Sequence, residues 1–264
     1  MSCPSASFAV WTAAWLHGAA ATDDVLDALA VWREHHDVVA ADHTAADELD
    51  LPMRGSYPAS PVQLLAALRR VGTVGTRLVL PAPGDVRGLG GQTSFATAAL
   101  TAREGVVLTG ARFGLVPVPA ADQVLSWTVH TLPSTAVVEH VGLGEAEHAL
   151  SEALRSSAAT LQSLDVAKGR PGVRDELRGR LATRPDPDWP AGMPQRALRV
   201  LQRANEVATI LQLAAEDEPG AALSSAAANQ RADALRPLDA AVRAARTAAV
   251  HEAIRVLAEG ADHY

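Results

Sequence analysis

The chain has 264 residues, of which 48% are hydrophobic and 20% charged, so it is long enough and apolar enough to bury a core without disulfide bonds or bound metals. This composition excludes an intrinsically disordered chain. The formal net charge of −7 at pH 7 disfavours nonspecific nucleic-acid binding, which depends on neutralising phosphate groups. Cys3 is the only cysteine, which excludes an internal disulfide framework, and we interpret it as incidental.

Neither of the two most apolar stretches predicts a membrane segment. The apolar patch at residues 8–11 has no basic residue before it, although the start of a signal peptide carries such a charge. The later stretch, residues 207–215, contains Gln212 and is too short to span a bilayer. We therefore expect a soluble cytoplasmic protein that does not contact the membrane.

Helices dominate the predicted elements before residue 72. The first is expected at residues 11–17 and the second from Thr22, whose hydroxyl can cap it. Residues 42–49 favour one or two further helical turns. The strongest local pattern is Ser60-Pro61-Val62-Gln63, where the serine caps a helix, the proline occupies its first turn and the glutamine completes a capping box. We expect this helix to end at Gly72.

Extended segments follow between residues 77 and 132. Two of them flank Gly110-Ala111-Arg112, a spacing typical of a β-hairpin. Because regular alternation of strand and helix is absent, we predict an α+β fold with a small mixed or antiparallel sheet covered by helices, rather than a doubly wound sheet. The expected strands are residues 77–80, 105–109, 113–118 and 124–132, with a helix at residues 94–103.

From Gly144 onward the pattern is helical and rich in alanine, with an interruption by a proline-rich loop at residues 184–190. Pro237 either kinks one long helix or begins a second one. We therefore predict an α+β region at residues 1–143 and an all-α helical bundle at residues 144–264, which can pack as one compact unit and make the protein mainly helical overall. The expected helices are residues 144–164, 195–215, 224–236 and 238–259.

A glycine-rich segment between a predicted strand and a predicted helix, residues 83–94, is the best candidate for ligand binding. Glycines let the backbone approach a ligand closely, and free N–H groups at the start of a helix attract anions. Arg87 can supply a positive charge that Asp85 orients, while Thr93 or Ser94 can cap the helix. The segment lacks the Gly-Lys-Ser/Thr ending of a P-loop and the dinucleotide-binding fingerprint, so a flexible connection with an Arg–Asp pair is the alternative. The candidate ligand-binding residues are Asp85, Arg87, Gly88, Gly90, Gly91, Thr93 and Ser94.

Two clusters combine imidazole and carboxylate side chains, which are common ligands of transition metals. On a continuous helix His36, His43 and Asp47 would share one face and could hold a metal, whereas the alternative is a solvated connection between helices. Glu145 and His148 have the i, i+3 spacing found in di-iron bundles, but no second motif accompanies them. We interpret these two residues as an exposed helix start and predict no cofactor.

No catalytic signature such as Gly-x-Ser-x-Gly or His-Glu-x-x-His is present, so the sequence leaves open whether the protein is an enzyme. Our leading hypothesis is a non-enzymatic interaction or assembly protein that uses its helical half to form a homo-oligomer or to bind a protein partner. The alternative is a binding protein or enzyme for an anionic metabolite, phosphorylated or carboxylated, at the Gly84–Gly91 loop. Nucleic acid is disfavoured as a partner, although arginines around Arg174 offer a surface for an acidic one.

Overall fold

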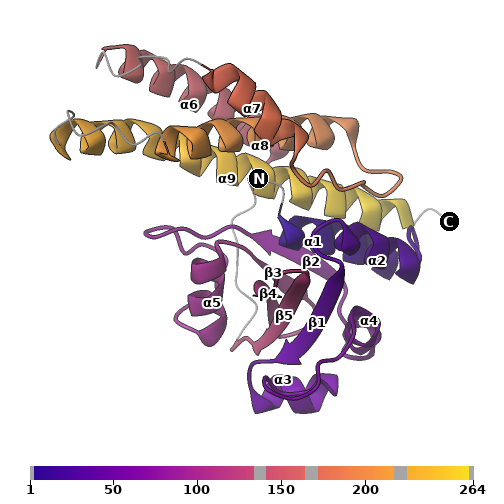
Figure 1. Cartoon of the computed structure of the whole chain (residues 1–264). Helices are drawn as coiled ribbons and strands as arrows, with labels where there is room; N and C mark the ends of the chain where they lie inside the picture. Colours follow the sequence, from indigo (N-terminus) through magenta and orange to yellow (C-terminus); the bar gives the residue numbers. More distant parts are fainter. Residues whose placement is uncertain (1–2, 134–140, 164–171, 217–224, 262–264) are drawn as a thin grey trace. The chain divides into compact units, whose positions relative to one another are not determined.

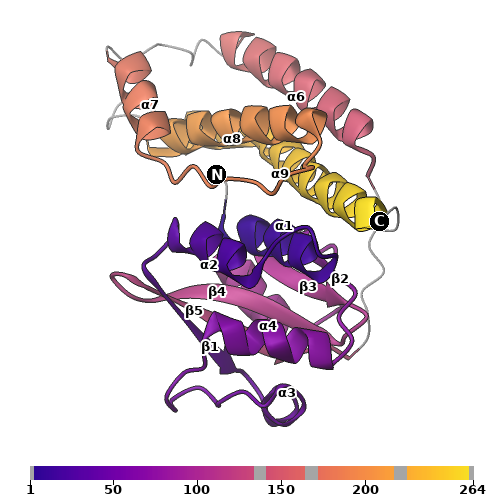
Figure 2. The ribbon, with the colours of Figure 1, turned by 90° about the vertical axis from the view of Figure 1, so that its right-hand side faces the viewer.

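The computed structural model describes residues 3–133, 141–163, 172–216 and 225–261 (Figures 1 and 2). It confirms the predicted α+β class, with a five-stranded mixed sheet in the N-terminal half and a helical C-terminal region. The described residues form two compact units, one drawn from residues 3–133, 185–194 and 250–261 and the other from residues 141–163, 172–184, 195–216 and 225–249. In chain order the elements are α1 (Pro4–Leu16), α2 (Thr22–Ala30), β1 (His35–Ala40), α3 (His43–Leu49), α4 (Pro61–Arg70), β2 (Gly75–Val79), α5 (Ser94–Ala102), β3 (Gly105–Thr109), β4 (Phe113–Ala121), β5 (Val124–Thr131), α6 (Leu143–Ser163), α7 (Val173–Ala182), α8 (Gln195–Glu216) and α9 (Ser225–Ala261).

The sheet has the strand order β1-β5-β4-β3-β2. β1 runs parallel to β5, and the other neighbours are antiparallel, with β3 and β4 forming the predicted hairpin. The sequence did not predict β1, because its first half, His35-His36-Asp37, is polar and its partner strand lies far along the chain. Residues 35–40 are therefore a strand and not part of a helical connection.

Helices α1 and α5 cover opposite faces of the sheet (Figure 1). On β5 the ring of Trp127 packs against Phe8 of α1 at a centroid distance of 4.8 Å, while His130 contacts Ser94 of α5. Successive side chains of a strand point to alternate faces, so two residues at an odd spacing contact different helices. β5 thus separates an apolar layer under α1 from a layer under α5 that contains polar groups.

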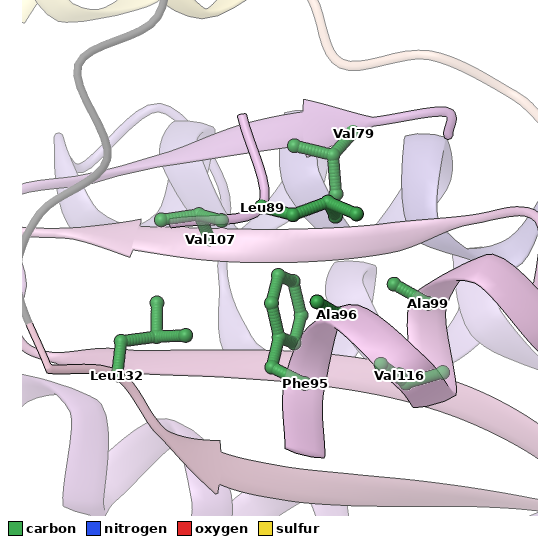
Figure 3. Packing of buried hydrophobic residues seen from close by; sticks show 8 residues of the cluster. All are labelled: Val79, Leu89, Phe95, Ala96, Ala99, Val107, Val116 and Leu132. Atoms are coloured by element: carbon green, nitrogen blue, oxygen red, sulfur yellow. The ribbon is translucent and has the colours of Figure 1, made fainter. Parts of the chain in front are cut away.

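The core beneath α5 is built around Phe95, which is fully buried. Figure 3 shows its ring among side chains of the neighbouring strands and of Leu89. Leu89 comes from the glycine-rich loop and is 1% exposed, so this side chain anchors the loop to the core. Gly88 and Gly90, on either side of it, have φ angles of 81° and 73°, which glycine adopts without steric cost. The whole cluster consists of Val79, Leu89, Phe95, Ala96, Ala99, Val107, Val116 and Leu132.

Helix starts follow the local sequence closely. In α4 the predicted capping box is present, because the Gln63 amide donates to Ser60 Oγ at 3.3 Å and the Ser60 amide donates to Gln63 Oε1 at 2.8 Å. α2 begins at Thr22 as predicted, but the expected cap was wrong. Instead, the Ala21 amide donates to the Asp24 carboxylate at 2.7 Å, since Thr22 is already the first helical residue.

The second unit contains α6, α7, α8 and the first part of α9, and Figures 1 and 2 show α8 and α9 side by side. Glu147 on α6 pairs with Arg196 on α8 at 2.9 Å, and Arg180 on α7 pairs with Glu216 at the end of α8. Pro237 lies inside one long helix rather than at the start of a second one. The observed structure therefore selects the single helix from the two alternatives that the sequence left open.

Gly114 on β4 lies beneath Phe95, and a Cβ at this position would lie 2.6 Å from the ring. We expect Gly114→Ala to lower the free energy of unfolding by about 1–3 kcal/mol, because the buried ring has no room to move aside. Gly75→Ala on β2 is the matched control, since its added Cβ would make only ordinary contacts at 3.9 Å. Urea denaturation measures both changes, and equal stability of the two variants would contradict the packing described here.

Candidate functional site

The candidate site lies where the carboxyl end of β5 meets the amino end of α5. Because β1 and β5 are parallel, their carboxyl ends lie at the same edge of the sheet. β5 ends there with His130 and Thr131, Asp42 follows β1, and α5 begins at Ser94. Carboxyl ends of parallel strands and amino ends of helices are both common places for ligands.

Ser94 and His130 form the central pair of this site. Ser94 Oγ lies 3.1 Å from His130 Nδ1, and Ser94 is exposed whereas His130 is only 5% exposed. The other ring nitrogen of His130, Nε2, is buried and makes no hydrogen bond with any described residue. A buried polar atom without a partner costs about 1–3 kcal/mol, so a ligand atom that bonds to this nitrogen would be favourable.

The electrostatic surroundings keep His130 neutral. Burial lowers the pKa of His130 to about 4, although the charge of Asp42 opposes this effect, and Arg54 lowers it further. At physiological pH one ring nitrogen therefore carries a proton and the other carries a lone pair. Either Ser94 donates to Nδ1 and Nε2 carries the proton, or Nδ1 donates to Ser94 Oγ. In both tautomers the ring offers a ligand one hydrogen bond and no charge.

Free backbone amides lead into the amino end of α5. Of the two caps that the sequence left open, Thr93 and Ser94, the structure has Thr93, whose Oγ1 accepts from the Ala96 amide at 3.0 Å. The amides from Gly90 to Phe95 donate no hydrogen bond to the residues that the structure describes. A run of free N–H groups at the positive end of a helix dipole is suited to an anion.

Arg54 and Asp42 bring opposite charges to the site. Arg54 Nη2 donates to Thr128 Oγ1 at 3.2 Å, and the described part of the chain contains no carboxylate paired with Arg54. Asp42 accepts from the hydroxyl and the amide of Thr131, at 2.6 and 3.0 Å. Burial raises the pKa of Asp42, but the hydrogen bonds to its carboxylate outweigh this and lower it below its ordinary value. Asp42 therefore links the segment after β1 to the end of β5 by hydrogen bonds. The charge of Arg54 remains available to a ligand.

The predicted ligand-binding residues of the glycine-rich loop have different structural roles. Arg87 pairs with Asp85 through two N···O contacts of 2.8 and 2.9 Å, and its side chain is 64% exposed. Gly88, Gly90 and Gly91 all have positive φ, so the shape of the loop depends on them. The Arg–Asp pair expected in the alternative interpretation is thus present, and ligand binding by these residues stays a prediction.

The three proposed metal ligands are divided between two elements, β1 and α3. His36 is on β1, where Trp127 Nε1 donates to its Nδ1 at 3.0 Å and its Nε2 donates to the Leu29 carbonyl at 2.9 Å. Both ring nitrogens are engaged, and burial lowers the pKa of His36. His43 and Asp47 lie on α3, so the continuous helix that would align all three is absent because β1 is extended. Within the described ranges, no group of three or more His, Cys, Asp or Glu side chains is arranged to hold a metal ion.

Sequence reasoning missed four residues of the site: His130, Thr128, Asp42 and Arg54. The available signal was the alternation of Ser126, Thr128 and His130 along a predicted strand. Polar side chains at every second position usually mark a solvated face. In the structure Thr128 is 1% exposed and His130 is 5% exposed, and only tertiary packing buries them.

The candidate residues of the helical half lie on exposed surfaces. Glu145 and His148 belong to the first turns of α6, and Arg174 lies near the start of α7. In the part of the chain that the structure describes, none of them belongs to a group of three or more metal-ligating side chains. Among the helices described, none combines the length and the apolar character that crossing a membrane requires.

Family models cover most of the chain. Residues 5–142 match a model described as "Rv1486c-like protein, N-terminal domain", and residues 144–247 match the "Rv1486c-like protein, C-terminal domain". The two matches meet near residue 143, where the sequence pattern becomes helical. The division of the chain into an α+β region at residues 1–143 and a helical region at residues 144–264 stays a prediction.

Individual relatives extend over nearly the whole chain. It is 41% identical over 284 residues to "Uncharacterized protein Rv1486c" of Mycobacterium tuberculosis (strain ATCC 25618 / H37Rv), which covers 95% of this chain and 96% of the relative. It is 35% identical over 291 residues to "Uncharacterized protein ML1804" of Mycobacterium leprae (strain TN), with 95% and 97% covered. No solved structure matches the chain. Because these descriptions name no activity, the function is inferred from the site.

The pKa of His130 predicts a pH-dependent stability. Because burial lowers it from 6.5 to about 4, the unfolded chain binds more protons between these two values. The contribution of His130 to stability is therefore complete above pH 6.5 and is lost as the pH falls toward 4, at about 1.4 kcal/mol per pH unit. The free energy of unfolding, measured by urea denaturation at several pH values, should change less steeply with pH for His130→Gln than for the wild type. Identical slopes would contradict the burial of a neutral ring.

Proposed function

We propose that this chain, which belongs to the Rv1486c-like family, binds an anionic small molecule, phosphorylated or carboxylated, at the amino end of α5. The observation that supports this best is His130 Nε2, which is buried without a partner among the described residues while Ser94 holds the other side of the ring. A ligand atom that bonds to Nε2 removes the cost of this unpaired group. Ser94, on the Nδ1 side of the ring, is exposed, so a ligand can reach its hydroxyl from solvent.

The charges and dipoles around the site favour an anion over a neutral or cationic ligand. The amino end of a helix carries about half a positive charge, and the free amides from Gly90 to Phe95 add directed donors. Arg54 contributes a full positive charge, whereas Asp85 already neutralises Arg87. The carboxylate of Asp42 is engaged by Thr131, which limits its repulsion of a bound anion.

Loss of the Arg54 charge should weaken anion binding. We expect Arg54→Gln to raise the Kd for inorganic phosphate, pyrophosphate or citrate by roughly tenfold or more, because a charged hydrogen bond contributes roughly 1.5–3 kcal/mol. Ser94→Ala should weaken binding less, since it removes a neutral donor. Isothermal titration calorimetry measures the affinities, and a thermal-shift assay identifies the best anion first.

A second arginine provides the control for this experiment. Arg70→Gln removes the same charge from the exposed end of α4 and should leave the affinity unchanged. Arg87→Gln should have a smaller effect than Arg54→Gln because of its pairing with Asp85. If no anion binds the wild-type protein, or if the variants at positions 54 and 70 bind equally, the proposed site is wrong.

Self-association or partner binding through the helical unit is the second candidate function, as the sequence predicted. Ile210 on α8 supports it, because this large apolar side chain is 45% exposed. We expect light scattering of the full chain to report a dimer or a larger assembly, and Ile210→Asp to shift it toward the monomer. A strictly monomeric wild-type protein would count against assembly and would leave the anion site untouched.

A further inference from the structure

We propose that Ser94 is a nucleophile with His130 as its general base, and that the site hydrolyses a carboxylic ester that carries an anionic group. This inference deepens the proposed function and rests on it for the binding of that anionic group. It adds a covalent step at a serine that lies outside any catalytic signature of the sequence.

The pair meets the geometric requirement for an activated serine. Ser94 is exposed, so a substrate can reach Oγ, and the 3.1 Å distance to His130 Nδ1 allows direct proton transfer. The His130 ring is oriented by its burial and by an edge contact with Phe95, at a centroid distance of 6.2 Å. In the tautomer with the proton on Nε2, the lone pair of Nδ1 accepts the serine proton.

The start of α5 also offers donors for the charge that develops on the carbonyl oxygen. The backbone amides of Ser94 and Phe95 donate to none of the described residues, whereas the Ala96 amide donates to Thr93 Oγ1. In hydrolases whose nucleophile lies between a strand and a helix, the amide of the following residue stabilises the oxyanion. Phe95 is that residue here, and one such donor commonly contributes a factor of about 100–1,000 to the rate.

The reaction has two balanced steps. In the first, Ser94 Oγ bonds to the carbonyl carbon while its proton passes to His130 Nδ1. The ester C–O bond then breaks, and the departing alcohol takes this proton. In the second step, water attacks the acyl carbon and gives a proton to His130, after which the acyl–oxygen bond breaks and Ser94 recovers the proton. Water is the only co-reactant, and the products are the acid and the alcohol.

The charges around His130 predict the pH profile of acylation. Asp42 and Arg54 are the charged groups that act on the ring, and its pKa of about 4 leaves the base neutral over a wide range. Acylation should therefore keep its rate from about pH 8 to about pH 5, whereas a base of ordinary pKa would lose activity below about pH 6.5. Turnover should be slow, because the most efficient base has a pKa near the working pH.

A fluorophosphonate probe tests the proposal on the full chain. Ser94 Oγ would bond to phosphorus as the P–F bond breaks, which leaves a stable adduct at the nucleophile. We expect peptide mass spectrometry to locate the adduct at Ser94 in the wild type. Ser94→Ala should reduce labelling by about 100-fold or more, and His130→Gln should slow it by roughly 100-fold. Thr97→Ala, an exposed position one turn further along α5, should label at the wild-type rate.

Three outcomes would overturn the nucleophile: no labelling at saturating probe, labelling at another residue, or equal rates for Ser94→Ala and the wild type. If His130→Gln does not fold, the wild-type pH profile takes its place, and a rate that declines below about pH 6.5 contradicts the buried base. The probe is uncharged, so calorimetry with inorganic phosphate tests anion binding separately. Phosphate binding without labelling removes only the nucleophile, and labelling without phosphate binding removes only the anion site.

Discussion

The packing of Phe95 directly on the backbone of two strands is the contact on which the site depends. An added Cβ at Gly114 would lie 2.6 Å from this ring and one at Gly105 would lie 3.3 Å from it, so glycine at position 114 above all lets α5 lie so close to the sheet. This close approach places Ser94, the preceding residue, against His130 on β5. Leu89 fills the same core and holds the loop whose free amides lead into α5.

Two histidines on neighbouring strands, His36 half-buried and His130 buried, differ in their hydrogen-bond partners, and this difference separates a structural role from the proposed functional one. His36 on β1 uses both ring nitrogens, one with Trp127 and the other with the Leu29 carbonyl. His130 on β5 uses only Nδ1, and Nε2 has no partner within the described residues. Burial lowers the pKa of both rings, so the pKa alone does not distinguish them. The partners do, because His36 has no ring nitrogen left for a ligand, whereas His130 keeps Nε2 for one and also contacts the exposed Ser94.

The anion recognition proposed for this acidic protein depends on short-range donors. A net charge of −7 does not attract anions over long distances, so the field of the whole molecule gives no assistance to the site. The amides at the start of α5, the Ser94 hydroxyl and the Arg54 guanidinium act over one hydrogen-bond length instead. Such a set suits a small ligand that fits against the sheet edge, and it is poorly suited to a long polyanion.

The sequence by itself determined the elements whose signals are local: the capping box of α4, a cap of α5 at Thr93 or Ser94, and the β3–β4 hairpin, because each involves residues only a few positions apart. It also indicated the change to helices after residue 143 and the loop that precedes Ser94. Only the tertiary structure decided that residues 35–40 form a strand and that His130 is buried next to Ser94, Asp42 and Arg54. These features arise from contacts between residues far apart in the chain, and the burial of a polar stripe is set by what packs over it rather than by its own pattern.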